Sequence, residues 1–340
     1  MLRLALLIGV VTVLYFGKRL LLPLTVGALM AMLLNPLDVR LRSWGLPPGF
    51  AIAGSVGVLL LFFAGLFFAV GQQADNFAES WPQTQQRLVQ RLDALRQNSG
   101  LGELIPEITS KKKSQNRSED GGKDLLQQVP ISGSGIMSFL SGTFGVLGDF
   151  LLMLVYVVLF LSQKERLREF LLRRAPAGQR KKASQALDES RDIVQKYLRG
   201  RLILIAILTV LYSVGFLIIG LDYAILIAIL VAVLSIIPYL GNLIGGVFAM
   251  ALAFAGGNSV LGVVATMSLA QMLESYVLTP LIVGDEVDIN PLTTIICVVG
   301  MTLLWGPVGA IIAIPLFAIL RIICSHVDGL RDYAYLLGQE

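Results

Sequence analysis

Residues 222–256 read DYAILIAILVAVLSIIPYLGNLIGGVFAMALAFAG, and this stretch decides how the rest of the chain is interpreted. It holds two apolar runs, 222–236 and 242–256, which flank the break IPYLGN at 237–242. A helix needs about 20 residues to cross the hydrocarbon of a bilayer, so both runs are short. Irregular backbone at membrane depth is tolerated only where protein or a water-filled cavity covers it. The stretch therefore predicts either two short tilted spans or one re-entrant hairpin.

The same pattern returns near the end of the chain, where the runs 291–304 and 308–324 flank the break WGPVG. A long apolar run precedes each pair, namely 202–220 for the first and 259–283 for the second. The first long run leaves one side of the membrane and the second returns to it, so the two units have opposite orientation. Paired interruptions in inverted repeats indicate the binding site of a transporter.

The composition agrees with a membrane protein. Of 340 residues, 55% are hydrophobic and only 15% are charged, and the mean hydropathy is +0.75. Soluble domains carry about 25% charged residues. These values exclude an ordinary soluble enzyme, a disordered chain and a disulfide-stapled domain. We expect an all-α polytopic membrane protein with about eight membrane segments and the two broken helix pairs in inverted repeats.

Charge divides the chain into segments and sets its orientation. Segment 163–201 holds twelve basic and five acidic residues, whereas segment 72–142 holds eight of each. The positive-inside rule places the first in the cytoplasm and the second outside, so both termini are expected in the cytoplasm. The expected units are 1–71 (N-terminal membrane helices), 72–142 (extracytoplasmic amphipathic segment and loop), 143–162 (membrane helix), 163–201 (basic amphipathic helices facing the anionic inner leaflet), 202–324 (transport core) and 325–340 (cytoplasmic tail).

Glu274 is the principal candidate for chemistry, because it lies well inside the apolar run 259–283. An ionised carboxylate at mid-bilayer costs about 2.5–3.5 kcal/mol even on permissive scales. Gln271 precedes it by one turn and Ser275 continues the polar stripe. The neighbouring apolar runs contain no Lys or Arg, so no salt-bridge partner is evident. A desolvated carboxyl takes up a proton readily and suits proton coupling; the alternative is a structural carboxyl bonded to a carbonyl of a broken helix.

The two breaks are the next candidates. Pro238 and Pro307 remove helical hydrogen bonds and free carbonyl groups that can coordinate cations or hydroxylated solutes. Asn242 adds a polar side chain, and Gly241 with Gly245 forms a GxxxG pair that permits close helix contact. Gly306 and Gly309 flank Pro307 in the second break. Plain helix packing is the alternative for each break. The acidic residues 285, 286 and 288 suit either a cation vestibule or a solvated loop.

The sequence lacks the residue patterns of the enzyme classes that act with ATP or inside membranes. The chain lacks the GxxxxGK[ST] phosphate-binding motif. His326 is the single histidine, and no pair of apolar-run aspartates is present, which argues against intramembrane proteases. We expect no enzymatic activity, no cofactor, no metal site and no nucleic-acid partner.

Four blocks of the chain resemble the AI-2E family, the autoinducer-2 exporter-like permeases. They are Leu161–Pro176, Tyr197–Gly200, Ile237–Gly241, and a C-terminal series made of Gln271, Glu274, Pro280, Gly284, Pro291, Gly306, Gly309 and Pro315. The resemblance implies export of autoinducer-2 or a related small solute, or sodium/proton antiport. It also implies a homo-oligomer, a pentamer by expectation, with an elevator-like unit built from the broken hairpins. The resemblance adds Tyr239 and Pro280 to the candidate hinge positions. It also marks four residues already named above as candidate site or hinge positions, namely Gln271, Glu274, Pro238 and Gly241.

These observations predict a secondary transporter that exports a small polar solute and is coupled to protons or sodium at Glu274. Two alternatives stay open. One is a Na⁺(Li⁺)/H⁺ antiporter, which the same carboxylate serves equally well. The other is a membrane scaffold without transport, whose segment 72–142 or 163–201 binds a partner.

Overall fold

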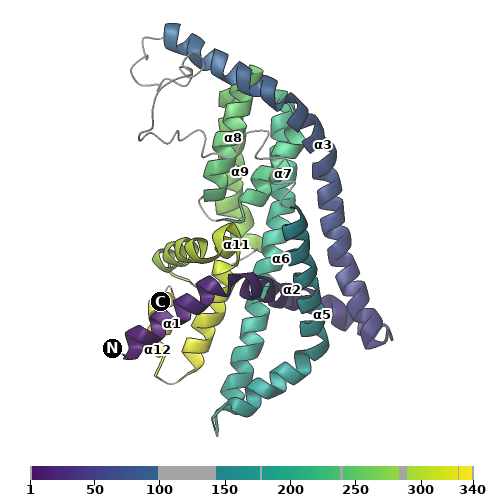
Figure 1. The fold of residues 1–340 in the computed structure, drawn as a ribbon, viewed down its shortest axis with the longest axis vertical. Coiled ribbons are helices and arrows are strands. Elements are labelled where there is room, and N and C mark those ends of the chain that lie inside the picture. The colour runs from purple at the N-terminus through teal and green to yellow at the C-terminus, as the bar shows by residue number, and fades with distance from the viewer. Residues whose placement is uncertain are drawn as a thin grey trace, which may run out of the picture.

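A computed structural model describes residues 2–98, 143–176, 178–237, 240–282, 289–327 and 329–338. Every regular element in these ranges is a helix (Figure 1). The helices are α1 (Leu2–Phe16), α2 (Lys18–Ser43), α3 (Pro48–Asn98), α5 (Thr143–Arg174), α6 (Arg180–Ile219), α7 (Ala224–Leu234), α8 (Leu240–Gly256), α9 (Val260–Leu273), the π-helix η1 (Glu274–Leu278), α10 (Thr279–Ile282), α11 (Pro291–His326) and α12 (Arg331–Leu337). The expected all-α class is confirmed for the described part of the chain.

Five helical stretches in the described ranges are long and apolar enough to cross a membrane. They are Lys18–Ser43, Pro48–Phe68, Arg180–Ile219, Val260–Ile282 and Pro291–His326. Two shorter apolar helices, Ala224–Leu234 and Gly241–Gly256, lie within residues 222–256. The apolar faces that these helices expose are those expected of a protein whose solvent is lipid.

The upper half of the molecule in Figure 1 is built around α6, which runs antiparallel to α9. Gly262 lies against Ile219 at one end of this pair, and Gly215 lies against Thr266 farther along. The small residues let the two helices approach closely, as in many membrane helix pairs. The pair α7 and α8 packs beside them, and together with α3 they form the largest apolar core. Its fully buried members include Leu208, Tyr212, Phe216, Ile227, Ala228, Val231, Ala249 and Val263.

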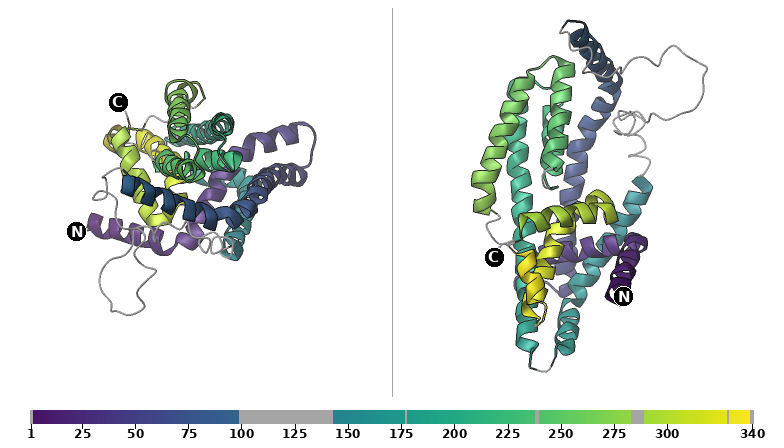
Figure 2. Two further views of the ribbon diagram at one scale, coloured as in Figure 1. Left: turned by 90° about the horizontal axis from the view of Figure 1, so that it is seen from above. Right: turned by 90° about the vertical axis from the view of Figure 1, so that its left-hand side faces the viewer.

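Helix α11 is two helices joined at a sharp break. Gly306 has φ 68° and ψ −155°, a left-handed conformation that residues with a side chain avoid. The arm before the break crosses the long axis of the molecule and the arm after it runs along that axis (Figure 2). The second arm packs against α2 and against the charged part of α6, burying Val194, Tyr197 and Leu198. The apolar face predicted in segment 163–201 is thus covered by protein.

The N-terminal helices form a separate apolar cluster in which α2, α3 and α5 meet. A charged group lies at its edge. Asp38 on α2 is completely buried, and its Oδ2 lies 2.8 Å from Nζ of Lys164 on α5 and 3.0 Å from Nε of Arg42. The Lys164 ammonium also donates to Asn35 Oδ1 at 2.8 Å. This cluster joins two helices far apart in sequence.

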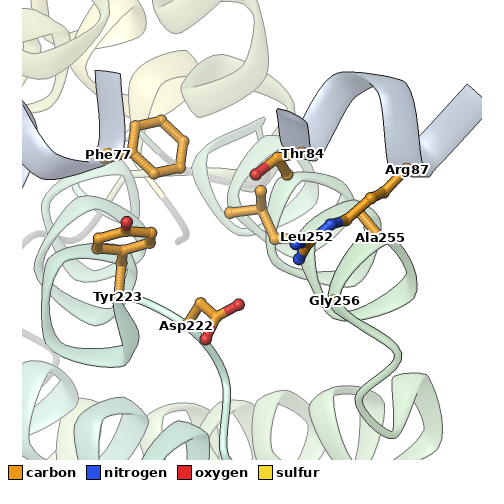
Figure 3. A pocket seen from close by; sticks show the side chains of 8 residues that line it. All are labelled: Phe77, Thr84, Arg87, Asp222, Tyr223, Leu252, Ala255 and Gly256. Atoms are coloured by element: carbon orange, nitrogen blue, oxygen red, sulfur yellow. The ribbon is translucent and has the colours of Figure 1, made fainter. Parts of the chain in front are cut away.

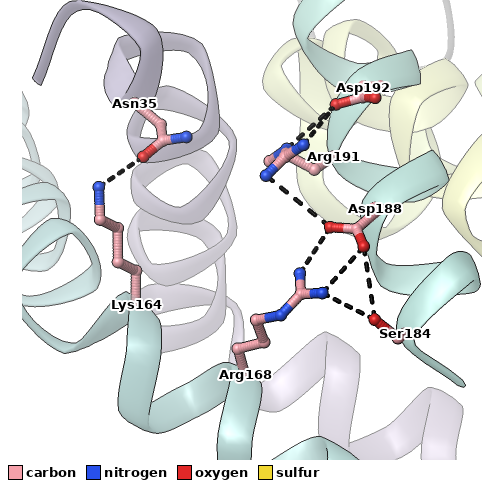
Figure 4. Close-up of polar contacts among 7 residues, drawn as sticks. All are labelled: Asn35, Lys164, Arg168, Ser184, Asp188, Arg191 and Asp192. Atoms are coloured by element: carbon pink, nitrogen blue, oxygen red, sulfur yellow. Dashed lines mark hydrogen bonds and ion pairs between the residues drawn. The ribbon is translucent and has the colours of Figure 1, made fainter. Parts of the chain in front are cut away.

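Helices α5 and α6 continue beyond their apolar parts and meet near Pro176. Arg168 on α5 donates two parallel hydrogen bonds to Asp188 on α6, at 2.5 Å and 2.8 Å, and a third to Ser184 (Figure 4). The Arg168 hydrogen bond holds the pKa of the Asp188 carboxyl below its ordinary value of 3.8. The pair fixes the charged ends of the two helices against each other.

Candidate functional site

Glu274 occupies the first position of the π-helix η1, where α9 gives way to α10. The residue is only 6% exposed, so α6 and the turns around it cover the carboxyl group. A π-turn inside an α-helix is rare and occurs frequently at functional sites, because it interrupts the regular hydrogen-bond ladder. The backbone irregularity and the buried acid therefore coincide at one residue.

Arg201 on α6 is the partner of Glu274, which corrects the expectation that the acid has no evident cation. Its Nη1 lies 3.5 Å from Glu274 Oε1, and the two side chains are 15% and 7% exposed. Arg201 lies one residue before the apolar run 202–220, so the apolar runs alone do not reveal it. A long arginine stem can lie along apolar surface and carry its charge into a neighbouring turn. The buried acid thus forms an ion pair that joins η1 to α6.

The other three polar candidates form a chain of hydrogen bonds that joins α8, α9 and η1. Asn242 on α8 donates through Nδ2 to Gln271 Oε1. Gln271 in turn donates through Nε2 to Ser275 Oγ at 3.1 Å. The structure therefore brings Asn242, Gln271 and Ser275 together, and Glu274 faces α6 instead. One helical segment carries an uncharged polar group on one face and an ion pair on another.

An open groove of about 420 Å³ lies between α8 and α9 beside this chain. Its polar residues are Asn242, Ser268 and Gln271, and none of the lining residues that the structure describes is charged. The remaining walls are Leu243, Gly246, Met250, Val264 and Met267. Asn242 Oδ1 is buried and has no hydrogen-bond partner in the described structure. The groove therefore offers amide and hydroxyl side chains and two flexible methionines, which suits a small uncharged ligand with hydroxyl groups.

The glycines of the first break hold α7 and α8 together, as the GxxxG pair predicts. A side chain on Gly241 would overlap the carbonyl group of Leu234, and one on Gly245 would press on Val231. Gly309 has the same role in the second break, where a Cβ would overlap the carbonyl group of Met301. Each break therefore brings its two helical arms into direct backbone contact.

The other hinge candidates fall in different surroundings. Gly306 makes the left-handed turn of α11, and Pro307 begins its second arm. Pro280 lies on α10 with its ring exposed. Pro238 and Tyr239 lie outside the described residues, as do the acidic residues 285, 286 and 288. Within the described ranges no group of three metal-ligating side chains is present.

The far end of α3 makes a second polar joint that sequence reasoning did not identify. This part of α3 arches over the ends of α7 and α8 (Figure 1). Arg91 donates to the Phe254 carbonyl at 3.1 Å, and Gln73 Oε1 accepts from the Leu226 amide at 3.1 Å. Tyr223, whose backbone is left-handed at φ 57°, donates its hydroxyl to the Asn76 carbonyl. The arch thus binds both helices of the broken pair.

A small pocket of about 20 Å³ lies inside this joint, which is room for one water molecule. Figure 3 shows Phe77, Thr84 and Arg87 of α3 on one side and Tyr223 and Asp222 on the other. The rings of Phe77 and Tyr223 meet edge to face at 5.4 Å. This pocket is therefore too small for a solute larger than water.

The fold and the site define a polytopic helical membrane protein with broken helix pairs and a buried ion pair. A family model described as the AI-2E family transporter matches residues 4–329. The chain therefore belongs to the AI-2E family of transporters.

Named relatives agree with this assignment. The protein named "Putative transport protein YrrI", from Bacillus subtilis (strain 168), is 26% identical over 92% of this chain and 88% of its own length. The AI-2 transport protein TqsA of Escherichia coli (strain K12) is 22% identical over 99% of this chain and 96% of its own. The match to "Putative transport protein YueF" of Bacillus subtilis is 29% identical and covers 58% of this chain and about half, 54%, of that protein.

Proposed function

We propose that this chain is a secondary transporter that exports a small polar solute and draws its driving force from proton or cation binding at Glu274. The observation that carries the proposal is the placement of this buried carboxylate in a π-turn between α9 and α10, against the charge of Arg201. Ionisable side chains in membrane segments are expensive, and they commonly mark ion or proton paths.

The two broken pairs support a transport mechanism. Helix α7 has 11 residues, about 16 Å of helix, which is roughly half the hydrocarbon thickness of a bilayer. We propose that α7 and α8 form a re-entrant hairpin and that the two arms of α11 form its inverted counterpart. Hairpins of this kind can carry a site from one side of the membrane to the other without unfolding.

The groove beside Asn242 and Gln271 is the proposed solute site. The described residues of its lining carry no charge, so it favours an uncharged hydroxylated solute over a carboxylate or an ammonium ion. Autoinducer-2 belongs to the class of small polar solutes that we propose as cargo, and TqsA is named as an AI-2 transport protein. We further propose that the transporter works as a homo-oligomer in the bacterial inner membrane, with both termini in the cytoplasm.

Flux in proteoliposomes tests the proposal. The full chain would be reconstituted and assayed with autoinducer-2, Na⁺ and Li⁺, with and without a pH gradient. We expect Glu274→Gln to abolish gradient-driven flux, because the amide cannot exchange a proton. Glu165→Gln, at an exposed position of α5, is the matched control and should keep the wild-type flux. Unchanged gradient dependence in Glu274→Gln contradicts the coupling proposal.

A Na⁺(Li⁺)/H⁺ antiporter is the second candidate, because one carboxylate with a nearby cation suits two ions that compete for the same oxygens. Proton release on addition of Na⁺ or Li⁺, without solute flux, favours this candidate. A wild-type protein that folds and moves neither solute nor ion favours the scaffold instead.

A further inference from the structure

The ion pair between Arg201 and Glu274 is loose for its degree of burial. Charge-assisted N–H···O bonds between arginine and carboxylate are about 2.7–2.9 Å long and are commonly bidentate. Here a single Nη1···Oε1 contact of 3.5 Å joins the two groups. By contrast, the half-exposed pair of Arg168 and Asp188 makes two short parallel bonds. The buried pair therefore gains attraction without tight hydrogen bonding.

Each partner also leaves a buried polar atom without a hydrogen bond in the described structure. These atoms are Glu274 Oε2 and Arg201 Nε. The hydroxyl of Tyr212, on the same helix as Arg201, is buried and has no partner either. Buried polar atoms are nearly always satisfied in stable cores, and an exception calls for an explanation such as an exchanging ion or water. The unpaired oxygen leaves Glu274 one site at which to take up a proton or a cation.

Among the residues that the structure describes, few other titratable groups surround the carboxylate. On α6, Arg201 forms the ion pair with Glu274, and Tyr212 is close enough to interact with the Glu274 carboxylate electrostatically. Tyr197, also on α6, interacts with Arg201 in the same way. Helices α9 and α10 contribute no titratable side chain, because their sequences are VLGVVATMSLAQML and TPLI. Tyr276 of η1 points away and is 78% exposed. Arg201 is thus the cation that determines the charge balance at Glu274 within the described structure.

We propose that Arg201 is the resident counter-ion of Glu274, which occupies the carboxylate while the site is empty and is displaced when Glu274 takes up a proton or a cation. This inference rests on the proposed function and names the residue that competes with the coupling ion. A protonated carboxyl is neutral, so its attraction for Arg201 is lost when the proton arrives. A charged guanidinium without a partner is then costly in a buried position, which favours its movement toward water.

The pair links ion binding to the contact between two helices. Arg201 lies on α6 and Glu274 lies on the π-turn that ends α9. When the pair separates, the contact between α6 and η1 weakens, and α9 carries the Gln271 side of the solute groove. An ion shifts a conformational equilibrium only through its different affinity for the two states. Displacement of Arg201 provides that difference.

Infrared titration of the buried carboxyl group tests the inference without any transport assay. The full chain in detergent would be titrated from about pH 4 to about pH 10, and the infrared C=O band of the protonated carboxylic acid would be recorded at each pH. The band that Glu274→Gln removes is the band of Glu274. We expect Arg201→Gln to move its midpoint upward by one pH unit or more, because the carboxylate loses its counter-ion. Arg199→Gln, an exposed arginine on the same helix, should leave the midpoint unchanged.

Arg201→Lys covers the case in which the neutral variant does not fold. Lysine keeps the charge on a shorter reach, so we expect a smaller upward shift than for glutamine. An unchanged midpoint in Arg201→Gln, or in Arg201→Lys when only that variant folds, overturns the inference. Absence of flux from wild-type protein with a shifted midpoint in the variant refutes the transport proposal and leaves the counter-ion in place, so the two failures can be told apart.

Discussion

Gly241 lies directly on the backbone of Leu234, with no space between them for a side chain. This contact closes the turn between α7 and α8, and it occurs at the glycine that follows the Pro-Tyr-Leu break. Gly309 and Met301 repeat the arrangement in α11. The two broken pairs therefore share one packing solution although their loop sequences differ.

The first prediction concerns this contact. Gly241→Ala should separate α7 from α8 or prevent their pairing, since overpacking costs about 1–3 kcal/mol even against movable side chains and the obstacle here is backbone. Thermal unfolding of the detergent-solubilised protein measures the loss. Gly57→Ala is the matched control, because a Cβ at Gly57 meets nothing within 4 Å. Equal unfolding midpoints for the two variants contradict the close contact.

The second prediction concerns Asp38, whose charge is buried between Lys164 and Arg42. Asp38→Asn leaves the Lys164 ammonium without its carboxylate, and breaking a buried ion pair typically costs about 3–5 kcal/mol. The unfolding midpoint in detergent should fall accordingly. Asp149→Asn, at an exposed position, should have little effect. A double variant, Asp38→Asn with Lys164→Met, should recover part of the loss, and failure to recover any argues against pairwise coupling.

The third prediction concerns pH and the pair of Arg168 and Asp188. The pKa of Asp188 is lowered in the folded protein by the Arg168 hydrogen bond, so the stabilisation is present in full above pH 3.8, the ordinary value. It is lost as the pH falls below 3.8 and through the lowered pKa. Because both side chains are more than a third exposed, water screens the pair and its contribution is about 0–1 kcal/mol.

Comparison with Asp188→Asn measures this effect. The difference in unfolding free energy between wild type and Asp188→Asn should be constant at neutral pH and should shrink toward zero in acid. A difference that grows as the pH falls has the wrong sign for this pair.

The fourth prediction concerns Trp305, which precedes the left-handed turn of α11 and donates its indole N–H to the Leu14 carbonyl at 2.9 Å. Trp305→Phe removes the donor and should cost about 1 kcal/mol. Helix α1 loses an anchor, so its amides should exchange hydrogen faster when followed by mass spectrometry. Trp44→Phe, at a position that is 71% exposed, is the control and should leave α1 unaffected.

The sequence predicts the broken helix pairs well, because length and Pro/Gly content act locally. Apolar runs of about 15 residues and the breaks after Ile237 and at Gly306 are visible without tertiary information. The close contact at Gly241 also follows from residue size. The same reasoning marks Gln271 and Glu274 as unusual, since polar groups in apolar runs are expensive wherever they point.

Pairings between distant helices are less accessible to sequence reasoning. In the sequence Arg201 belongs to the charged segment 163–201, and its reach into an apolar turn depends on the stagger between α6 and α9. Asp38 and Lys164 lie 126 residues apart, so neither predicts the other. The sequence marks both Gln271 and Asn242 as polar candidates, yet only the packing of α8 on α9 shows that they bind each other and that Glu274 faces elsewhere.

The arch of α3 has a consequence for how the protein can vary. Arg91 binds the carbonyl group of Phe254, which every residue carries, and Gln73 binds the amide N–H of Leu226, which every residue except proline carries. The side chains at positions 226 of α7 and 254 of α8 can therefore change while the backbone groups that bind α3 stay the same. Two transporters with dissimilar α7 and α8 sequences can share these hydrogen bonds, and only the α3 sequence would then show that the bonds are present.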